Sequence, residues 1–294
     1  MITMSFAIMT DTAANLLNSH LTQRVITAVP LEYFLDGVAH ICHSVDELDG
    51  EAFYASLNDK EIKTAQSNPQ RFLDAMEPLL KEGRDILCVT LSSGVSGTYT
   101  SACIAAEQLC ESYPDRTIRV IDSLGASLGE GLLVLHACDC RDAGKSLEET
   151  AAELAYMRER MCQVFTVDDL RFLRKGGRIS GAVAFVGTLL DFKPLLKGNE
   201  DGKIVMCGKT RGKKRAIAAM AEKYESLVVD AKEQRIGIAY AGHYEDAKKL
   251  EELLKKNKPP REILTVCYEP VTGVHVGPGA LALFFLGDAG VRKK

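Results

Sequence analysis

None of the nine cysteines stands in a C-x-x-C pair, and apart from Cys138-Asp-Cys140 each stands alone. An odd number of scattered cysteines is typical of reduced core thiols in a cytoplasmic protein. Cys138, Cys140 and the nearby His136 could in principle bind a metal, but their spacing matches no zinc pattern. We therefore expect a cytoplasmic protein with no metal site and no cofactor.

The sequence also lacks a broad excess of positive charge and any long apolar run. The net charge of -4 leaves no broad basic surface for nucleic acid. One basic run, Lys209-Thr-Arg-Gly-Lys-Lys-Arg215, is either the solvated start of a helix or a docking point for an acidic partner. No apolar run is long enough to span a membrane, and residues 1–11 lack the basic leader of a signal peptide. We expect neither nucleic-acid binding nor an integral membrane segment.

The chain is organised around residues 85–102, where an apolar run stops in a loop of hydroxyls and glycines. Residues 86–91 are predicted to form a buried strand, and Ser96-Gly97-Thr98 falls where the next helix should start. Free amide N–H groups and the helix dipole favour an anion at such a junction. The alternative is that Ser92, Ser93 and Ser96 only cap the helix.

This loop lacks the residues that other phosphate or ester sites require. A P-loop needs a lysine after its second glycine, and none follows Gly97. A Rossmann fingerprint needs three glycines, where this loop has Gly94 and Gly97. A nucleophile elbow needs a glycine two residues after the serine, where Thr98 follows Ser96. The sequence therefore favours an anion other than a nucleotide.

Strand, polar loop and helix alternate at least three times in the first half of the chain, which predicts a mostly parallel sheet flanked by helices. Asp11, Ser96 and Asp122-Ser123 should then gather at the carboxyl edge of this sheet, where ligands bind. The character of the chain changes after Met161. We predict two α/β domains, residues 1–161 and 162–294, with a ligand between or beside them.

Several shorter segments carry specific expectations. Residues 25–43 are predicted to form a hairpin, and Asn68 and Pro69 to start a helix, which leaves Thr64 in a loop at the helix entrance. Residues 182–190 are apolar on nearly every face and are predicted to form a buried helix. His275 stands in a predicted glycine-proline loop before an apolar strand at residues 280–286. A lone loop histidine is more often structural than functional.

Motifs along nearly the whole chain resemble those of the DegV family of bacterial fatty-acid-binding proteins. The matching stretches are Thr10-Asp-Thr-Ala-Ala-Asn-Leu16, Lys63-Thr-Ala-Gln66, Leu91-Ser-Ser-Gly-Val-Ser-Gly-Thr-Tyr99, Val120-Ile-Asp-Ser123, Asp169-Leu-Arg-Phe-Leu-Arg-Lys-Gly-Gly-Arg-Ile-Ser180, Lys193-Pro194 and His275-Val-Gly-Pro-Gly279. Each stretch is short alone, but the Ser-Gly-Thr and Lys-Gly-Gly-Arg-Ile-Ser stretches are specific in combination. Departures from the family pattern occur at Asn15, Ala65 and Ser67, beside the head-group loops.

The resemblance implies a non-catalytic protein that holds one long-chain fatty acid with its tail buried. The family member it is similar to presents the carboxylate to a separate ATP-dependent kinase subunit, which forms an acyl phosphate. By this resemblance Thr64 and Ser96 hold the carboxylate. Arg178, Arg211 and His275 lie at the cleft edge and face the kinase partner or the phosphorylated head group.

Burial of the tail would supply most of the affinity, since about 0.8 kcal/mol per methylene gives on the order of 12 kcal/mol for roughly sixteen carbons before ordering costs. Residues 182–190 and 280–286 are candidates for lining the tail, or are ordinary core.

Two functions other than fatty-acid binding stay open. One is a hydrolase or transferase with Ser96 as nucleophile, His275 as base and Asp11 or Asp122 orienting it. The other is a regulatory module whose ligand changes its contacts with another protein.

Overall fold

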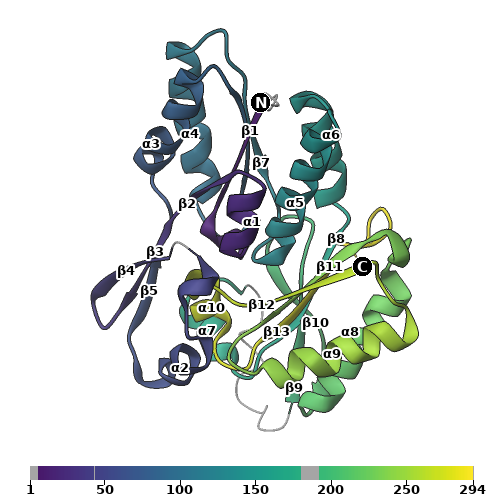
Figure 1. Cartoon of the computed structure of the whole chain (residues 1–294). Coiled ribbons are helices and arrows are strands. Elements are labelled where there is room, and N and C mark those ends of the chain that lie inside the picture. The colour runs from purple at the N-terminus through teal and green to yellow at the C-terminus, as the bar shows by residue number, and fades with distance from the viewer. Residues whose placement is uncertain (1–5, 43, 180–191, 294) are drawn as a thin grey trace.

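A computed structural model of the protein describes residues 6–42, 44–179 and 192–293 (Figure 1). The expected α/β class is confirmed: a parallel sheet flanked by helices is joined to a second, sheet-rich domain. The predicted buried helix at residues 182–190 lies outside the described residues. No helix in the described ranges is long and apolar enough to cross a membrane.

The first sheet has four parallel strands in the order β2-β1-β6-β7. Its inner strands are buried on both faces and carry continuous apolar runs, as parallel strands between two helical layers do. The strands are β1 (Phe6–Asp11), β2 (Ile26–Val29), β6 (Asp85–Thr90) and β7 (Ile118–Asp122). All four carboxyl ends therefore lie at one edge of the sheet.

Two helical layers cover this sheet. Ala7, Met9, Ile86 and Cys88 pack toward α3 (Pro69–Lys81) and α4 (Thr98–Ser112). The alternate side chains, such as Ile8 and Leu87, pack toward α5 (Leu128–Asp142) and α6 (Leu147–Arg158). The predicted start of α3 is confirmed, because Asn68 caps it, and α6 begins with a Ser146–Glu149 capping box.

The second sheet has six strands in the order β10-β9-β8-β13-β11-β12. Only β11 and β12 pair in parallel, and the other neighbours are antiparallel. Strands β9 and β10 form an antiparallel hairpin. The strands are β8 (Met161–Thr166), β9 (Phe192–Gly198), β10 (Ile204–Arg211), β11 (Arg235–Tyr240), β12 (Glu262–Cys267) and β13 (Leu281–Leu286).

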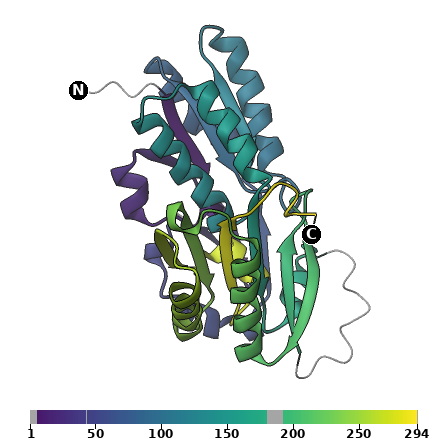
Figure 2. The ribbon, with the colours of Figure 1, turned by 90° about the vertical axis from the view of Figure 1, so that its right-hand side faces the viewer.

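The two faces of this sheet have different partners. Helices α8 (Lys213–Leu227) and α9 (Tyr244–Asn257) cover one face, as Figure 2 shows from the side. The opposite face packs against α5 of the first domain, and the largest apolar cluster runs from Leu87 through Leu132 to Phe284. Helix α5 therefore packs against both sheets, and this places the inner face of the second sheet beside the loops of the first sheet.

A third, antiparallel sheet has the order β4-β3-β5 and comprises Val38–Cys42, Leu31–Leu35 and Ile62–Ala65. The predicted hairpin in residues 25–43 is confirmed for β3 and β4, although residues 26–29 form β2 of the first sheet instead. Strand β3 contacts α10 (Pro270–Val276) of the second domain. A short helix, α2 (Gly50–Ala55), adds a bond from the Tyr54 hydroxyl to the Tyr268 carbonyl at 2.8 Å. The remaining short elements are α1 (Asn18–Gln23), α7 (Leu170–Lys175) and 3-10 turns at Thr12–Ala14, Val45–Glu47, Leu57–Asp59 and Ala231–Glu233.

Asn15 joins the first domain to the second at the end of β12. Its side-chain amide donates to the Cys267 carbonyl at 2.9 Å, and its side-chain oxygen accepts from the backbone N–H of Glu269. An acid at this position could not donate to the carbonyl, and it would add a charge beside buried Asp11 and Glu269. Asn15 also has a φ of 58°, which asparagine tolerates better than most residues. These contacts favour an amide side chain at position 15.

Candidate ligand-binding site

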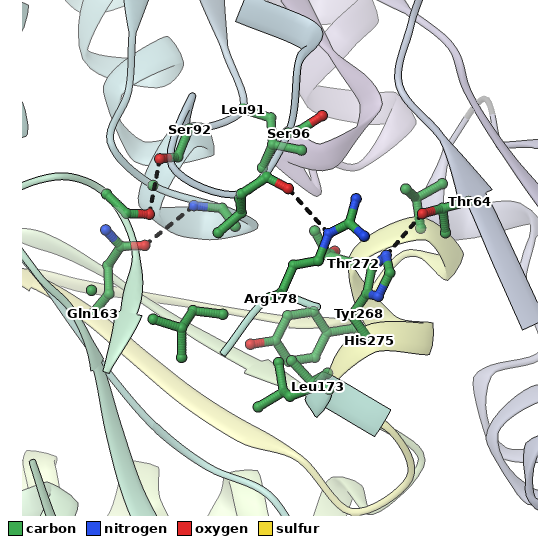
Figure 3. Close-up of a pocket in the computed structure, with 18 of the residues that line it drawn as sticks. Thr64, Leu91, Ser92, Ser96, Gln163, Leu173, Arg178, Tyr268, Thr272 and His275 are labelled. Carbon is green, nitrogen blue, oxygen red and sulfur yellow. Dashed lines mark hydrogen bonds between the residues drawn. The ribbon is translucent and has the colours of Figure 1, made fainter. Parts of the chain in front are cut away.

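A cavity lies between the loops of the first sheet, the third sheet and the inner face of the second sheet (Figure 3). Its free volume is about 870 Å³, including the space at its open mouth. Most of the wall is aliphatic or aromatic, as in pockets that bury apolar ligands. The apolar wall residues include Leu31, Leu91, Val95, Ala126, Phe165, Leu173, Ile204, Val271, Val276 and Phe284.

Thr64 and His275 form a polar pair in this wall, with Thr64 Oγ1 and His275 Nε2 2.8 Å apart (Figure 3). Thr64 lies on β5, not in a loop as the sequence predicts, because residues 62–65 pair with β3. His275 lies in the last turn of α10, so the predicted glycine-proline loop begins only after it. This hydrogen bond joins β5 and α10, whose bonded residues are 211 positions apart in the chain.

The imidazole of His275 is neutral at physiological pH. Burial, together with the nearby positive charge of Arg178, lowers the pKa of His275 to about 4. A neutral ring offers one N–H donor and one acceptor. It can therefore bond to Thr64 and still act as an uncharged polar partner for a second group.

Arg178 reaches the cavity from the loop after α7, where Gly177 has a φ of 70° and turns the chain sharply. Its Nε donates to the Val95 carbonyl at 3.1 Å, and its Nη1 donates to the Gly176 carbonyl. Partial burial lowers the pKa of Arg178, but it stays a cation at neutral pH. A fixed positive charge thus lies beside the Thr64–His275 pair.

Ser96 lies in the loop between β6 and α4, and it also lines the cavity. Its Oγ is 2.9 Å from Thr98 Oγ1 and accepts the backbone N–H of Thr98, the first residue of α4, at 3.3 Å. Ser92 and Ser93 bond to other loops, since Ser92 Oγ donates to the Gly202 carbonyl at 3.0 Å. The serines therefore do more than cap the helix, and the first turn of α4 keeps amide groups for an anion.

The predicted gathering of Asp11, Ser96 and Asp122 at the carboxyl edge is confirmed, but both carboxylates hold backbone. Asp11 accepts from the N–H of Leu91 at 2.9 Å and from the N–H of Ala13. Asp122 accepts from the N–H of Ser93 at 3.1 Å and from its hydroxyl. The two acids fix the shape of the serine loop from either side.

The Ser–His–Asp arrangement of the hydrolase hypothesis is not assembled. The hydroxyl of Ser96 bonds to Thr98, and the ring of His275 bonds to Thr64. Both proposed orienting acids, Asp11 and Asp122, are engaged by loop backbone. The described side chains therefore do not show Ser96 as a nucleophile held by His275.

Only part of strand 280–286 lines the cavity. Phe284 does so, whereas Leu281, Leu283 and Phe285 point to the opposite face and pack with α8 and α9. Alternate residues of a strand face opposite sides, so an apolar run on β13 serves two cores at once. For these three residues the ordinary-core alternative is correct.

Arg211, predicted to lie at the cleft edge, ends β10 in an exposed position and is not among the residues that line the cavity.

The cavity wall also contains polar residues that the sequence does not predict. Gln163 is one of them, and its side-chain amide bonds to the Leu124 carbonyl and to the Ala126 N–H. Tyr268 and Thr272 also line it. A lone glutamine inside the largely apolar strand β8 is a weak sequence signal of an inward polar position.

A second, basic groove adjoins the cavity at His275, which lines both. This outer groove contains four cations and one acid, and it lies between the third sheet and α7. Its charged residues are Lys60, Asp169, Arg171, Arg174 and Lys175. An anion at the polar end of the cavity would therefore lie next to a positively charged surface.

Comparisons with known proteins agree with this architecture. The family model described as DegV, a family of uncharacterised proteins, matches residues 5–288. A DegV domain-containing protein of Clostridium perfringens is 38% identical over 284 residues, covering 96% of this chain and 98% of the relative.

Solved structures show the same fold over nearly the whole chain. A DegV family protein from Thermus thermophilus, described in terms of its fatty-acid binding, has a TM-score of 0.87 and 30% identity, covering 97% of this chain and 100% of its own. DegV of Bacillus subtilis, described as a fatty-acid-binding protein, has a TM-score of 0.83 and 29% identity, with coverage of 97% and 100%.

Proposed function

This chain belongs to the DegV family, and from that premise we propose that it binds one long-chain fatty acid in the cavity. The observation that carries the proposal is an apolar cavity whose wall includes a hydroxyl, a neutral imidazole and a guanidinium within one region. An apolar wall suits an acyl tail, and the hydroxyl and the imidazole suit its carboxylate. The fatty-acid binding described for similar structures supports the same choice.

The tail would supply affinity and the polar groups would supply orientation. Burial of each methylene contributes about 0.8 kcal/mol, so roughly sixteen carbons contribute on the order of 12 kcal/mol before ordering costs. Each hydrogen bond to a charged carboxylate contributes about 1.5 to 3 kcal/mol. In our proposal Thr64 and Ser96 donate these bonds, as their positions in the cavity wall support.

We further propose that the protein does not itself perform chemistry on the fatty acid but presents its carboxylate to an ATP-dependent kinase partner. The basic groove beside His275 supports this, because a phosphorylated head group or an acidic partner would be attracted to it. Arg178 borders the cavity, and Arg211 is exposed at the end of β10. Both are proposed to face the partner, and the odd number of cysteines, none of them in a C-x-x-C pair, supports a cytoplasmic location.

The binding proposal is tested by mass spectrometry of lipid extracted from protein purified from a bacterial host, and by titration of delipidated protein with palmitate and oleate. We expect bound fatty acid and saturable uptake at one molecule per chain. Lipid-free protein that also fails to take up either fatty acid would refute the proposal.

The presentation proposal is tested by acyl-phosphate formation from ATP with a cognate fatty-acid kinase. Arg178→Ala should retain its bound lipid but lower the rate of product formation. Arg119→Ala removes an exposed arginine of β7 that pairs with Glu148 and lines neither cavity nor groove, so it serves as the control. Loss of the lipid itself in Arg178→Ala would place that arginine in carboxylate binding instead.

A further inference from the structure

A cluster of possible metal ligands lies on the helical hairpin of α5 and α6, which run side by side in Figure 1. His136 and Cys140 are four residues apart and therefore share one face of α5. Glu153 faces them from α6. None of the three lines the fatty-acid cavity.

The distances between the three ligand atoms approach those of a tetrahedral zinc site. His136 Nε2 and Glu153 Oε2 are 3.1 Å apart, Cys140 Sγ and Glu153 Oε2 are 3.3 Å apart, and Cys140 Sγ and His136 Nε2 are 3.4 Å apart. Zinc bonds of about 2.0 to 2.3 Å at tetrahedral angles place such atoms roughly 3.3 to 3.6 Å apart. Side-chain movements of a few tenths of an ångström would therefore admit the ion.

The carboxylate of Glu153 is already oriented for this role. Lys145 Nζ lies 2.5 Å from Oε1, which leaves Oε2 directed at the histidine and the cysteine. Outer partners of this kind fix the geometry of metal ligands in known sites. Lys145 can keep its bond while Oε2 binds a metal through one oxygen.

The three side chains are buried to different degrees, and this leaves a path from solvent by which a metal can enter. Cys140 is 3% exposed, whereas the side chains of His136 and Glu153 are 33% and 39% exposed. His136 additionally lines a surface cleft that reaches β11 and β13. The thiolate would be shielded while the open side of the cluster accepts a water molecule.

We propose that His136, Cys140 and Glu153 bind one Zn²⁺ ion, with water as the fourth ligand. The zinc–sulfur bond forms as the thiol proton of Cys140 leaves to solvent, so no oxidant or reductant is involved. Nitrogen, sulfur and oxygen ligands together are typical of zinc. Bound zinc clamps α5 to α6, and so stabilises the helix that begins two residues after the cavity residue Ala126.

The sequence does not reveal this site because its ligands come from two helices. Cys138, which suggests a Cys138–Cys140 pair, instead packs in the main apolar cluster on another side of α5. The third ligand lies 13 residues beyond Cys140, after the turn that joins the helices. This separation of 13 residues does not resemble the short ligand pairs of common zinc motifs.

The test is a titration of reduced, chelator-treated full-length protein with Co²⁺ and then Zn²⁺. We expect one equivalent of Co²⁺ to give tetrahedral visible bands and a thiolate-to-cobalt charge-transfer band, and Zn²⁺ to abolish both by displacement. Saturating zinc, at roughly 100-fold its dissociation constant, should raise the Tm by about 4 °C.

Variants separate this site from adventitious binding. Cys140→Ser should lose the charge-transfer band, and His136→Gln should weaken zinc binding by about 10-fold or more. The control Cys110→Ser removes an exposed thiol at the end of α4 and should behave as the parent. If Cys140→Ser fails to fold, as judged by circular dichroism, the half-exposed His136→Gln carries the comparison.

Absence of the charge-transfer band in the parent protein would overturn the proposal, and the three side chains would then form only a hydrogen-bonded cluster. The same holds if the band persists in Cys140→Ser, or if the zinc affinities of His136→Gln and Cys110→Ser both equal that of the parent.

Discussion

Replacement of Thr64 by valine tests the polar end of the cavity with little change of shape. Valine keeps the β-branched form that suits β5 and removes only the hydroxyl. That hydroxyl is 2.8 Å from His275 Nε2 and, in our proposal, donates to the fatty-acid carboxylate. The variant should therefore bind fatty acid more weakly while it keeps the fold.

The expected size follows from the bond that is lost. A hydrogen bond to a charged group contributes about 1.5 to 3 kcal/mol. At 1.4 kcal/mol per factor of ten, this raises the dissociation constant by about 10-fold to 140-fold. The free energy of unfolding should fall as well, by about 1 to 3 kcal/mol, because partly buried His275 is left without its partner.

The assay is displacement of a fluorescent fatty acid from delipidated protein, with palmitate and its methyl ester compared as competitors. The variant should lose affinity for palmitate but not for the ester, which carries no charge. Thr210→Val is the matched control, since Thr210 also lies on a strand and its hydroxyl has no partner among the described residues. Equal loss for palmitate and ester, or no loss for either, would refute the role of Thr64.

Two further predictions concern stability. Gly202→Ala should lower the free energy of unfolding in urea by about 1 to 3 kcal/mol, because Gly202 has a φ of 70° and a Cβ there would overlap Ser92 Oγ. Gly37→Ala, with a φ of 82° and open space around it, isolates the backbone contribution, and an equal loss would show that the contact with Ser92 is unimportant. Burial raises the pKa of Glu269 to about 7. The protonated carboxyl therefore makes its full contribution to the free energy of unfolding below about pH 4.5, and this contribution is lost as the pH rises through 7. The stability of the parent minus that of Glu269→Gln should therefore be smaller at pH 7.5 than at pH 5, and a difference independent of pH would contradict the assigned shift.

The sequence predicts the secondary structure well where local signals are strong. The caps at Asn68 and Ser146 and the apolar runs of β1 and β6 lead directly to observed elements. Local signals fail for β5, a polar segment that becomes a strand only because β3 supplies its hydrogen bonds. They fail again at His275, because the glycines that follow α10 predict a loop where the last turn of the helix lies.

The candidate site is predicted in part for the same physical reason. Ser96 and Arg178 lie in segments with turn and hydroxyl signals, and the structure places both at the cavity. Gln163 and Tyr268 give weak signals because their neighbours on β8 and β12 are those of ordinary buried strands. Their inward position is set by the pairing of six strands, which no local pattern encodes.

In the proposed complex with a fatty acid, affinity and orientation depend on different parts of the cavity, and this separation bears on how the function is measured. The tail contributes on the order of 12 kcal/mol before ordering costs, whereas one head-group bond contributes about 1.5 to 3 kcal/mol. A protein that loses one polar contact can therefore retain its lipid through purification and still hold the carboxylate in the wrong place. Since transfer to a carboxylate oxygen depends on its position, acyl-phosphate formation should respond more strongly than lipid content to changes at Thr64 and Ser96.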